Sequence, residues 1–346
     1  MFSSRKKRTI PYQMFDNATY GLAAKNARIL ERVYHKGHAQ AWDGKEVLQS
    51  LFDEHGLPKL DRQTREALGR VFSIILWGEL AAWRISAELA DELEPLEAKM
   101  AATSQAFDEA RHFYVMHDYL LAVDAMPERL PWGAQKLLES VMSADHLAKK
   151  LLGMQLMVEP VALTLFHIVK KLDIEPVLTA LMPYYERDEA RHVALGVQYL
   201  PAMLSQMSAL EKAGLWAYQM RLLTYEVASN VNLMRDLSIL GVNPRTLVEI
   251  GKGKQMKALT MVQESLGVDA TLPNTIMDRY ADTLVELTLP VQPGLTPRGR
   301  VKNAINVIRH GTPCPDIDLT PDIQDAETPL VRSVTDRVRR TSAAAA

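Results

Sequence analysis

The sequence predicts an all-α protein, because helix formers dominate its centre, apolar residues recur at helical spacing, and strand-like alternation is scarce. From about residue 61 to residue 289, Ala, Leu, Glu, Met, Lys and Arg prevail, and these residues favour helices. Apolar side chains return there every three or four positions, which places them on one face of a helix. We expect one large helical domain, since the chain of 346 residues can bury a substantial core.

Proline and glycine mark the breaks between the expected helices. The clearest breaks fall at Pro95, Pro131, Pro176, Gly267 and the Gly-Val-Asn-Pro run at 241–244. The predicted helices span residues 61–93, 96–124, 131–172 (in one piece or two), 176–207, 209–240, 244–266 and 273–288.

The two ends of the chain differ from this centre. The first 60 residues are mixed in character, with helices expected near 21–35 and 44–54. After Leu289, seven of the 18 prolines fall within 40 residues, which predicts an arm or disordered tail with one short helix near 298–309. We therefore divide the chain into an N-terminal extension, a helical domain and a proline-rich end, at residues 1–60, 61–289 and 290–346.

Charge and cysteine content exclude several classes of function. The net charge is −2 and basic clusters occur only at 5–8 and 337–340, so no nucleic-acid binding is expected. A single cysteine, Cys314, forms no intrachain disulfide and no iron–sulfur or zinc cluster, which fits a reducing cytoplasm. We see no signal peptide and no stretch of roughly 18 uncharged apolar residues, so no membrane span is expected.

The pentapeptide Asp-Glu-Ala-Arg-His occurs twice, at residues 108–112 and 188–192. Each copy contains Glu-x-x-His, whose two ends lie on one face of a helix and can reach the same metal ion. A dimetal site inside a helical bundle needs two such helices and one further glutamate from each of two others. The two pairs are Glu109 with His112 and Glu189 with His192.

Two lone glutamates in apolar surroundings lie at matching positions. In the first expected hairpin, Glu79 and Glu109 each lie 15 residues from the turn, and in the second Glu159 and Glu189 do. All four are then about 22 Å from their turns at about 1.5 Å per residue. The predicted metal ligands, which would also be the catalytic centre, are Glu79, Glu109, His112, Glu159, Glu189 and His192.

Four carboxylates in an apolar core need compensating positive charge. They repel one another and lose hydration, and an uncompensated buried carboxylate costs several kcal/mol or takes up a proton. Two divalent cations cancel four negative charges when both histidines are neutral. Four oxygen and two nitrogen ligands suit iron or manganese and leave coordination positions open for dioxygen.

The residues beside the predicted ligands are suited to supporting them. A metal-bound histidine normally donates its other N–H to a carboxylate. Asp108 and Asp188, each just before a ligand glutamate, are the expected acceptors. Arg111 and Arg191 are expected to neutralise these aspartates.

Further residues fall on the same helix faces. Glu186 is either a seventh ligand or proton carrier, or an ion-pair partner of Lys170 or Arg187, and we favour the ion pair. Pro160, directly after Glu159, is expected to kink or unwind the helix beside the metal. Additional pocket residues are expected at Tyr185, Gln105 and Gln155.

The six-residue pattern resembles the signature of the ferritin-like di-iron carboxylate oxygenases, over about residues 61–207. The doubled motif is most similar to the bacterial multicomponent monooxygenase hydroxylases. Three positions depart from subfamily patterns and leave the subfamily open. Met116 replaces the tyrosine of ribonucleotide reductase small subunits, Leu163 the threonine of the hydroxylases, and Tyr185 the additional histidine of the N-oxygenases.

The resemblance implies a ferritin-like four-helix bundle core with additional flanking helices, two Fe ions (or a Mn/Fe pair) and O2 as co-substrate. It implies an enzyme that hydroxylates, desaturates or N-oxygenates a small or apolar organic substrate. No nucleotide fingerprint or cysteine cluster is visible, so an external reductase or ferredoxin is expected to supply electrons. The alternatives are a ferroxidase, a mixed Mn/Fe oxidase, or a helical interaction protein without enzymatic activity. A cytoplasmic homodimer is expected.

Overall fold

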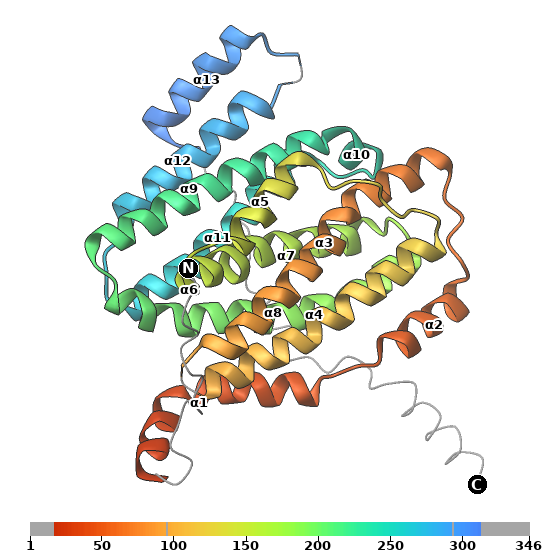
Figure 1. The fold of residues 1–346 in the computed structure, drawn as a ribbon. Coiled ribbons are helices and arrows are strands. Elements are labelled where there is room, and N and C mark those ends of the chain that lie inside the picture. Colours follow the sequence, from red (N-terminus) through yellow and green to blue (C-terminus); the bar gives the residue numbers. More distant parts are fainter. Residues whose placement is uncertain (1–16, 95, 293, 313–346) are drawn as a thin grey trace, which may run out of the picture.

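The computed structural model describes residues 17–94, 96–292 and 294–312, with side chains from Arg28 onward. These residues form helices and no β-strand, which confirms the all-α class (Figure 1). Cys314, both basic clusters and most of the predicted proline-rich end lie outside the described residues.

Helix starts agree with the local sequence. Asp61 caps one helix by accepting the backbone N–H groups of Gln63 and Thr64, and Ser208 forms a capping box with Glu211, so both starts satisfy otherwise free donors. The elements are α1 (Asn17–Ala39), α2 (Gly44–His55), α3 (Arg62–Glu92), α4 (Leu96–Ala122), α5 (Trp132–Met142), α6 (Leu147–Gly153), π-helix η1 (Met154–Val158), α7 (Glu159–Leu172), α8 (Pro176–Gln206), α9 (Ala209–Asn232), α10 (Met234–Ile239), α11 (Pro244–Ser265), α12 (Thr271–Thr288) and α13 (Pro297–His310).

Two predicted helices are interrupted. The predicted helix 131–172 consists of α5, α6, η1 and α7, in line with the expectation of more than one piece. The predicted single helix 209–240 is wrong, because it breaks at Leu233 into α9 and α10. The break lets α10 pack on α3, where Asp236 accepts a hydrogen bond of 2.8 Å from Arg70.

The helices pack in an arrangement that Figure 1 shows from one side. The antiparallel pair α3 and α4 and the pair α7 and α8 pack together, and α1 and α2 lie against α4 and α8. On the opposite side of the molecule from α1 and α2, α12 and α13 form a hairpin. The N-terminal helices thus contact two helices of the predicted central domain directly.

The apolar core consists of two clusters. One is built around Phe72, Tyr119 and Phe166, and the other includes Leu89 and Leu151. Along each of α3, α4 and α8, one half of the helix contributes to one cluster and the other half to the second. The level between the two clusters is where buried polar side chains gather.

One helical stretch meets the length and hydropathy criteria for a membrane span, which the sequence analysis did not single out. It covers Leu147–Leu172 and has a mean hydropathy of 1.5 in its most apolar window. In that window 72% is buried inside the protein. A core helix of a soluble protein meets the same criteria, so these criteria alone do not make the stretch a membrane span.

Candidate metal centre

Four helical segments bring all six predicted ligands together at the level between the two apolar clusters. They come from α3, α4, the first turn of α7, and α8, and each is at most 4% exposed. Their ligand atoms form two groups, within each of which all atoms lie within 4.8 Å of one another. Glu109 and Glu189 belong to both groups. The first group adds Glu79 and His112, and the second adds Glu159 and His192.

The imidazole of His112 divides its two nitrogens between different partners. Its Nδ1 lies 3.4 Å from an oxygen of Glu79 and 3.2 Å from one of Glu189. Its Nε2 lies 3.2 Å from Oδ2 of Asp188, on the opposite helix. An N–H that donates to this aspartate leaves the Nδ1 lone pair free for a metal ion.

His192 repeats this arrangement from the other side. Its Nδ1 lies 3.1 Å from Glu109 and 3.2 Å from Glu189, while its Nε2 lies 3.4 Å from Oδ2 of Asp108. Each predicted aspartate therefore contacts a histidine across the helix pair α4 and α8.

The two predicted arginines link the aspartates to each other. One terminal nitrogen of Arg191 lies 2.8 Å from both Asp108 and Asp188, and Arg111 lies 2.8 Å from Asp188 and also contacts Asp108. Arg187 also lies 3.5 Å from Asp188, so arginines compensate both aspartates, and the glutamates are compensated separately.

Trp42 also supports the centre, and the sequence analysis missed it. It precedes α2, and its indole N–H donates to Oδ2 of Asp188 at 2.7 Å. Its ring also lies 4.7 Å from the guanidinium carbon of Arg111. No motif or helical spacing marks Trp42, because the contact spans 146 positions of the chain.

The expected pocket residues lie close to the ligands. The amide of Gln105 donates to Glu159 at 2.6 Å and to Glu109 at 3.2 Å, and Gln155 donates to Gln105 at 3.3 Å. These two amides thus orient the carboxylates.

Tyr185 and Glu186 have supporting or separate roles. The hydroxyl of Tyr185 donates to the backbone carbonyl of His112 at 2.6 Å, and the two rings stack with centroids 4.3 Å apart. Glu186 lies outside both ligand groups and pairs with Lys170 at 2.6 Å. The ion pair that we favoured is therefore present.

The expected distortion beside Glu159 is present as the π-helix η1. The N–H of Glu159 bonds to the carbonyl of Met154, five residues earlier. Pro160 follows without an N–H to continue the helical ladder, and π-helical turns are often found at functional sites.

The carboxylates of the cluster need compensating positive charge. Burial, followed by repulsion from neighbouring carboxylates, raises the pKa of Glu79 well above its usual value. Burial likewise raises the pKa of Glu159. Burial alone would lower the pKa of His112, but the surrounding carboxylates outweigh it and raise that pKa well above its usual value. Protons or metal ions must therefore balance the four glutamates.

Some atoms of the predicted ligands lack a hydrogen-bond partner. Among the described residues, the buried side-chain atoms without a partner include Oε2 of Glu109, Oε2 of Glu159 and Nδ1 of His112, together with atoms outside the cluster such as Oγ1 of Thr179. Buried polar atoms rarely lack a partner. The first three belong to the predicted ligand set, and two divalent cations would satisfy them.

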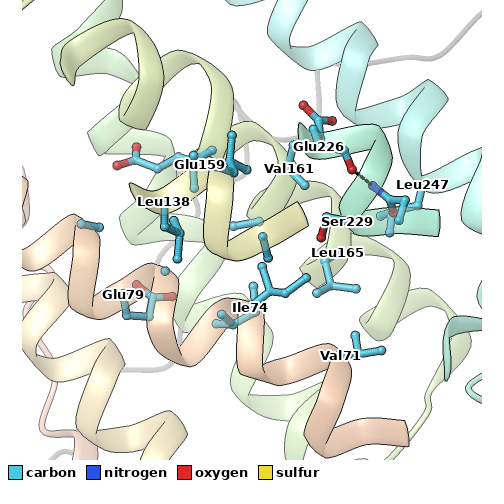
Figure 2. A pocket seen from close by; sticks show the side chains of 18 of the residues that line it. Val71, Ile74, Glu79, Leu138, Glu159, Val161, Leu165, Glu226, Ser229 and Leu247 are labelled. Atoms are coloured by element: carbon cyan, nitrogen blue, oxygen red, sulfur yellow. Dashed lines mark hydrogen bonds between the residues drawn. The ribbon is translucent and has the colours of Figure 1, made fainter. Parts of the chain in front are cut away.

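An apolar pocket of about 70 Å³ adjoins the cluster. Its lining includes the four glutamates of the predicted ligand set, and apolar side chains such as Ile74, Val161 and Leu165 form much of the rest (Figure 2). The lining also includes Glu226 of α9, a fifth buried carboxylate that carries no spacing signal in the sequence.

Comparison with protein-family models and with curated proteins gives no match. No protein-family model matches the chain, and no curated protein matches it at a significant level. The buried cluster is therefore the basis for assigning a function.

Proposed function

We propose that the protein is an O2-activating non-haem di-iron oxidoreductase with a ferritin-like four-helix core, acting on a small or apolar organic substrate. The observation that carries this proposal is the pair of overlapping ligand groups that share Glu109 and Glu189. Each group offers three carboxylates and one imidazole, and such oxygen and nitrogen ligands suit iron or manganese.

The arrangement favours a carboxylate-bridged pair of ions over two independent sites. Glu109 and Glu189 lie within reach of both positions, whereas Glu79 and Glu159 each belong to one group. The charges also agree, because two divalent ions balance the four glutamates while arginines compensate Asp108 and Asp188.

The side chains around the ions would orient ligands and exclude water. Bound ferrous ions would supply a binding position for dioxygen and electrons for its reduction. Asp188 and Asp108 hold the Nε2 side of the imidazoles, and Gln105 fixes one oxygen each of Glu109 and Glu159. The apolar pocket keeps water away and receives the substrate.

The reaction requires an external electron donor. Hydroxylation converts a C–H bond, O2, two electrons and two protons into C–OH and water. The substrate C–H bond supplies the other two of the four electrons that reduce O2. The chain has one cysteine, so we propose a separate ferredoxin or flavin-containing reductase as the donor.

Oxygen consumption by the iron-loaded protein with a chemical reductant tests this function. Glu109→Ala and His192→Ala should abolish iron binding and oxygen consumption while circular dichroism stays that of a helical protein. The controls Glu139→Ala and His117→Ala change partly exposed side chains outside the cluster and should keep both properties.

Full oxygen consumption in either ligand variant would refute the site. Iron uptake beyond two ions per chain, without reductant-dependent oxygen consumption, would contradict the oxygenase function and indicate a ferroxidase.

A further inference from the structure

Glu226 is a buried carboxylate for which the proposed metal centre has no use. It is 4% exposed and lines the apolar pocket. Its side chain accepts one hydrogen bond, from the amide of Gln255 at 2.7 Å. No ion pair joins it to a basic side chain among the described residues. The Gln255 amide is the one neighbouring group there that affects the pKa of Glu226.

The pocket separates Glu226 from the metal ligands by apolar side chains. Figure 2 shows Glu226 on one side of the pocket and Glu79 and Glu159 on the other, with Ile74 and Val161 in the space between. A molecule that fills the pocket thus meets carboxylates at both ends and hydrocarbon in the middle.

The other polar groups of the lining near Glu226 are few. Ser229 and Asn230 lie on the same helix. The side-chain amide of Asn230 donates to the backbone carbonyl of Glu226 at 3.0 Å. The carboxylate of Glu226 is therefore the charged group that a ligand would meet at this end.

We propose that Glu226 binds the ammonium group of a linear aliphatic amine whose carbon chain extends through the pocket to the cluster. An uncompensated buried carboxylate is costly, and an ammonium group supplies both the missing charge and a charge-assisted hydrogen bond. An anionic head group would be repelled, and a plain hydrocarbon would leave the carboxylate without a counter-ion.

Two further observations agree with this ligand. Burial raises the pKa of Glu226 to about 7, so a bound cation would stabilise the ionised form at neutral pH. The lining between the two ends is apolar, with Ile74 and Val161 in that stretch, and suits the hydrocarbon part of such an amine.

The substrate class rests on the proposed function, and it predicts which atom reacts. The nitrogen is held at Glu226, so a carbon lies beside Glu79 and Glu159. Oxidation then converts a C–H bond, O2, two protons and two electrons from the external donor into C–OH and water, and the amine stays unchanged.

Calorimetric titration of the full-length, iron-loaded protein under anaerobic conditions tests the ligand class. The probes are n-alkylamines from propylamine to octylamine, with alkanols and carboxylic acids of equal length, at pH 8. We expect amines to bind more tightly than alkanols, and acids not to bind. Glu226→Gln should weaken amine binding at least tenfold and alter alkanol binding less than threefold.

Two controls make the result specific. Ser229→Ala removes another polar group of the same lining and should leave amine binding within threefold of the original. Thermal unfolding of Glu226→Gln checks that the variant folds, since the new amide carbonyl can still accept the hydrogen bond from Gln255.

No amine binding to the original protein, or equal binding to Glu226→Gln, would overturn the proposal. An equal loss of alkanol and amine binding in Glu226→Gln would also overturn the proposal, because Glu226 would then recognise any hydrogen-bond donor. Iron content and oxygen consumption are measured in the same samples. If the protein binds no iron or consumes no oxygen but still binds amines through Glu226, the proposed function is contradicted and the amine site is not.

Discussion

At the scale of single residues, one oxygen of Asp188 connects three donors. Oδ2 lies 2.7 Å from the indole nitrogen of Trp42, 2.8 Å from Arg111 and 3.2 Å from Nε2 of His112. These contacts fix the carboxylate, and the carboxylate in turn fixes the imidazole. Trp42 thus acts on the cluster through Asp188, and its ring also lies 6.2 Å, between centroids, from the imidazole of His112.

Trp42→Phe is expected to lower the free energy of unfolding by about 1–3 kcal/mol, because it removes a buried hydrogen bond to a charged group. Iron affinity should fall as well, since Asp188 loses one of its positioning contacts. Chemical denaturation and an iron titration measure the two effects. Trp83→Phe, at a side chain that is 42% exposed, is the matched control. Equal stability losses in both variants would contradict the role of Trp42.

Glu226 makes stability depend on pH. Burial raises its pKa to about 7 in the folded protein from an ordinary value of 4.5. Below pH 4.5 both the folded and the unfolded state are protonated, so the group has no effect. Between pH 4.5 and about pH 7 only the unfolded state ionises. The free energy of unfolding therefore falls as pH rises through this range, by about 3 kcal/mol in total.

Glu226→Gln should therefore unfold at a higher denaturant concentration than the original protein at pH 8, and at nearly the same concentration at pH 4.5. Urea titrations at both pH values, compared within each pH, measure the difference. A stability gain that is the same at both values, or a loss at pH 8, would show that Glu226 is not destabilised by burial.

At the scale of elements, the π-helix η1 is the clearest departure from regular geometry near the cluster. It ends where Glu159 begins α7, and Pro160 follows directly. Pro160 lies in the first turn of α7, where a proline is tolerated because its missing N–H is not needed. The π-helix and Pro160 together set where Glu159 enters α7.

Pro160→Ala is expected to change the free energy of unfolding of the protein in chelator little, because a proline in the first turn of a helix is tolerated, and to weaken iron binding by letting the helix regularise. Pro201→Ala, inside α8 at a position away from the cluster, is expected to change stability without changing iron binding. Unaltered iron affinity in Pro160→Ala would show that the π-helix does not position Glu159.

The sequence predicted the helices and ligands that follow local rules. The Glu-x-x-His pairs and the lone glutamates lie at fixed distances along α3, α4, α7 and α8, so helical geometry alone places them on facing sides. Trp42 and Glu226 were not predicted, because tertiary packing and not spacing brings Trp42 to Asp188 and Glu226 to the pocket. The break at Leu233 was missed for a similar reason, since α10 turns to pack on α3 through Asp236.

At the scale of the whole molecule, a charged layer lies between two apolar clusters. The apolar clusters stabilise the fold, whereas four glutamates at their boundary oppose it unless cations are bound. A ligand that binds only the folded state stabilises it by about 4 kcal/mol at a concentration 1,000 times its Kd. Metal binding and folding are thus expected to be coupled.

Iron loading should therefore raise the melting temperature by several degrees, and chelator should reverse the change. The double variant Glu79→Gln with Glu159→Gln is expected to melt above the original protein in chelator, because it buries less charge, and to gain nothing from iron. Differential scanning calorimetry measures all four states. If iron still raised the melting temperature of the double variant, the bound ion would lie elsewhere in the protein.

Anomalous diffraction at the iron edge, from crystals of the iron-loaded protein, would locate the bound ions. We predict two peaks per chain, one beside Nδ1 of His112 and one beside Nδ1 of His192, with Glu109 and Glu189 reaching both. A single peak, a peak at another place, or no peak between these imidazoles would contradict this prediction.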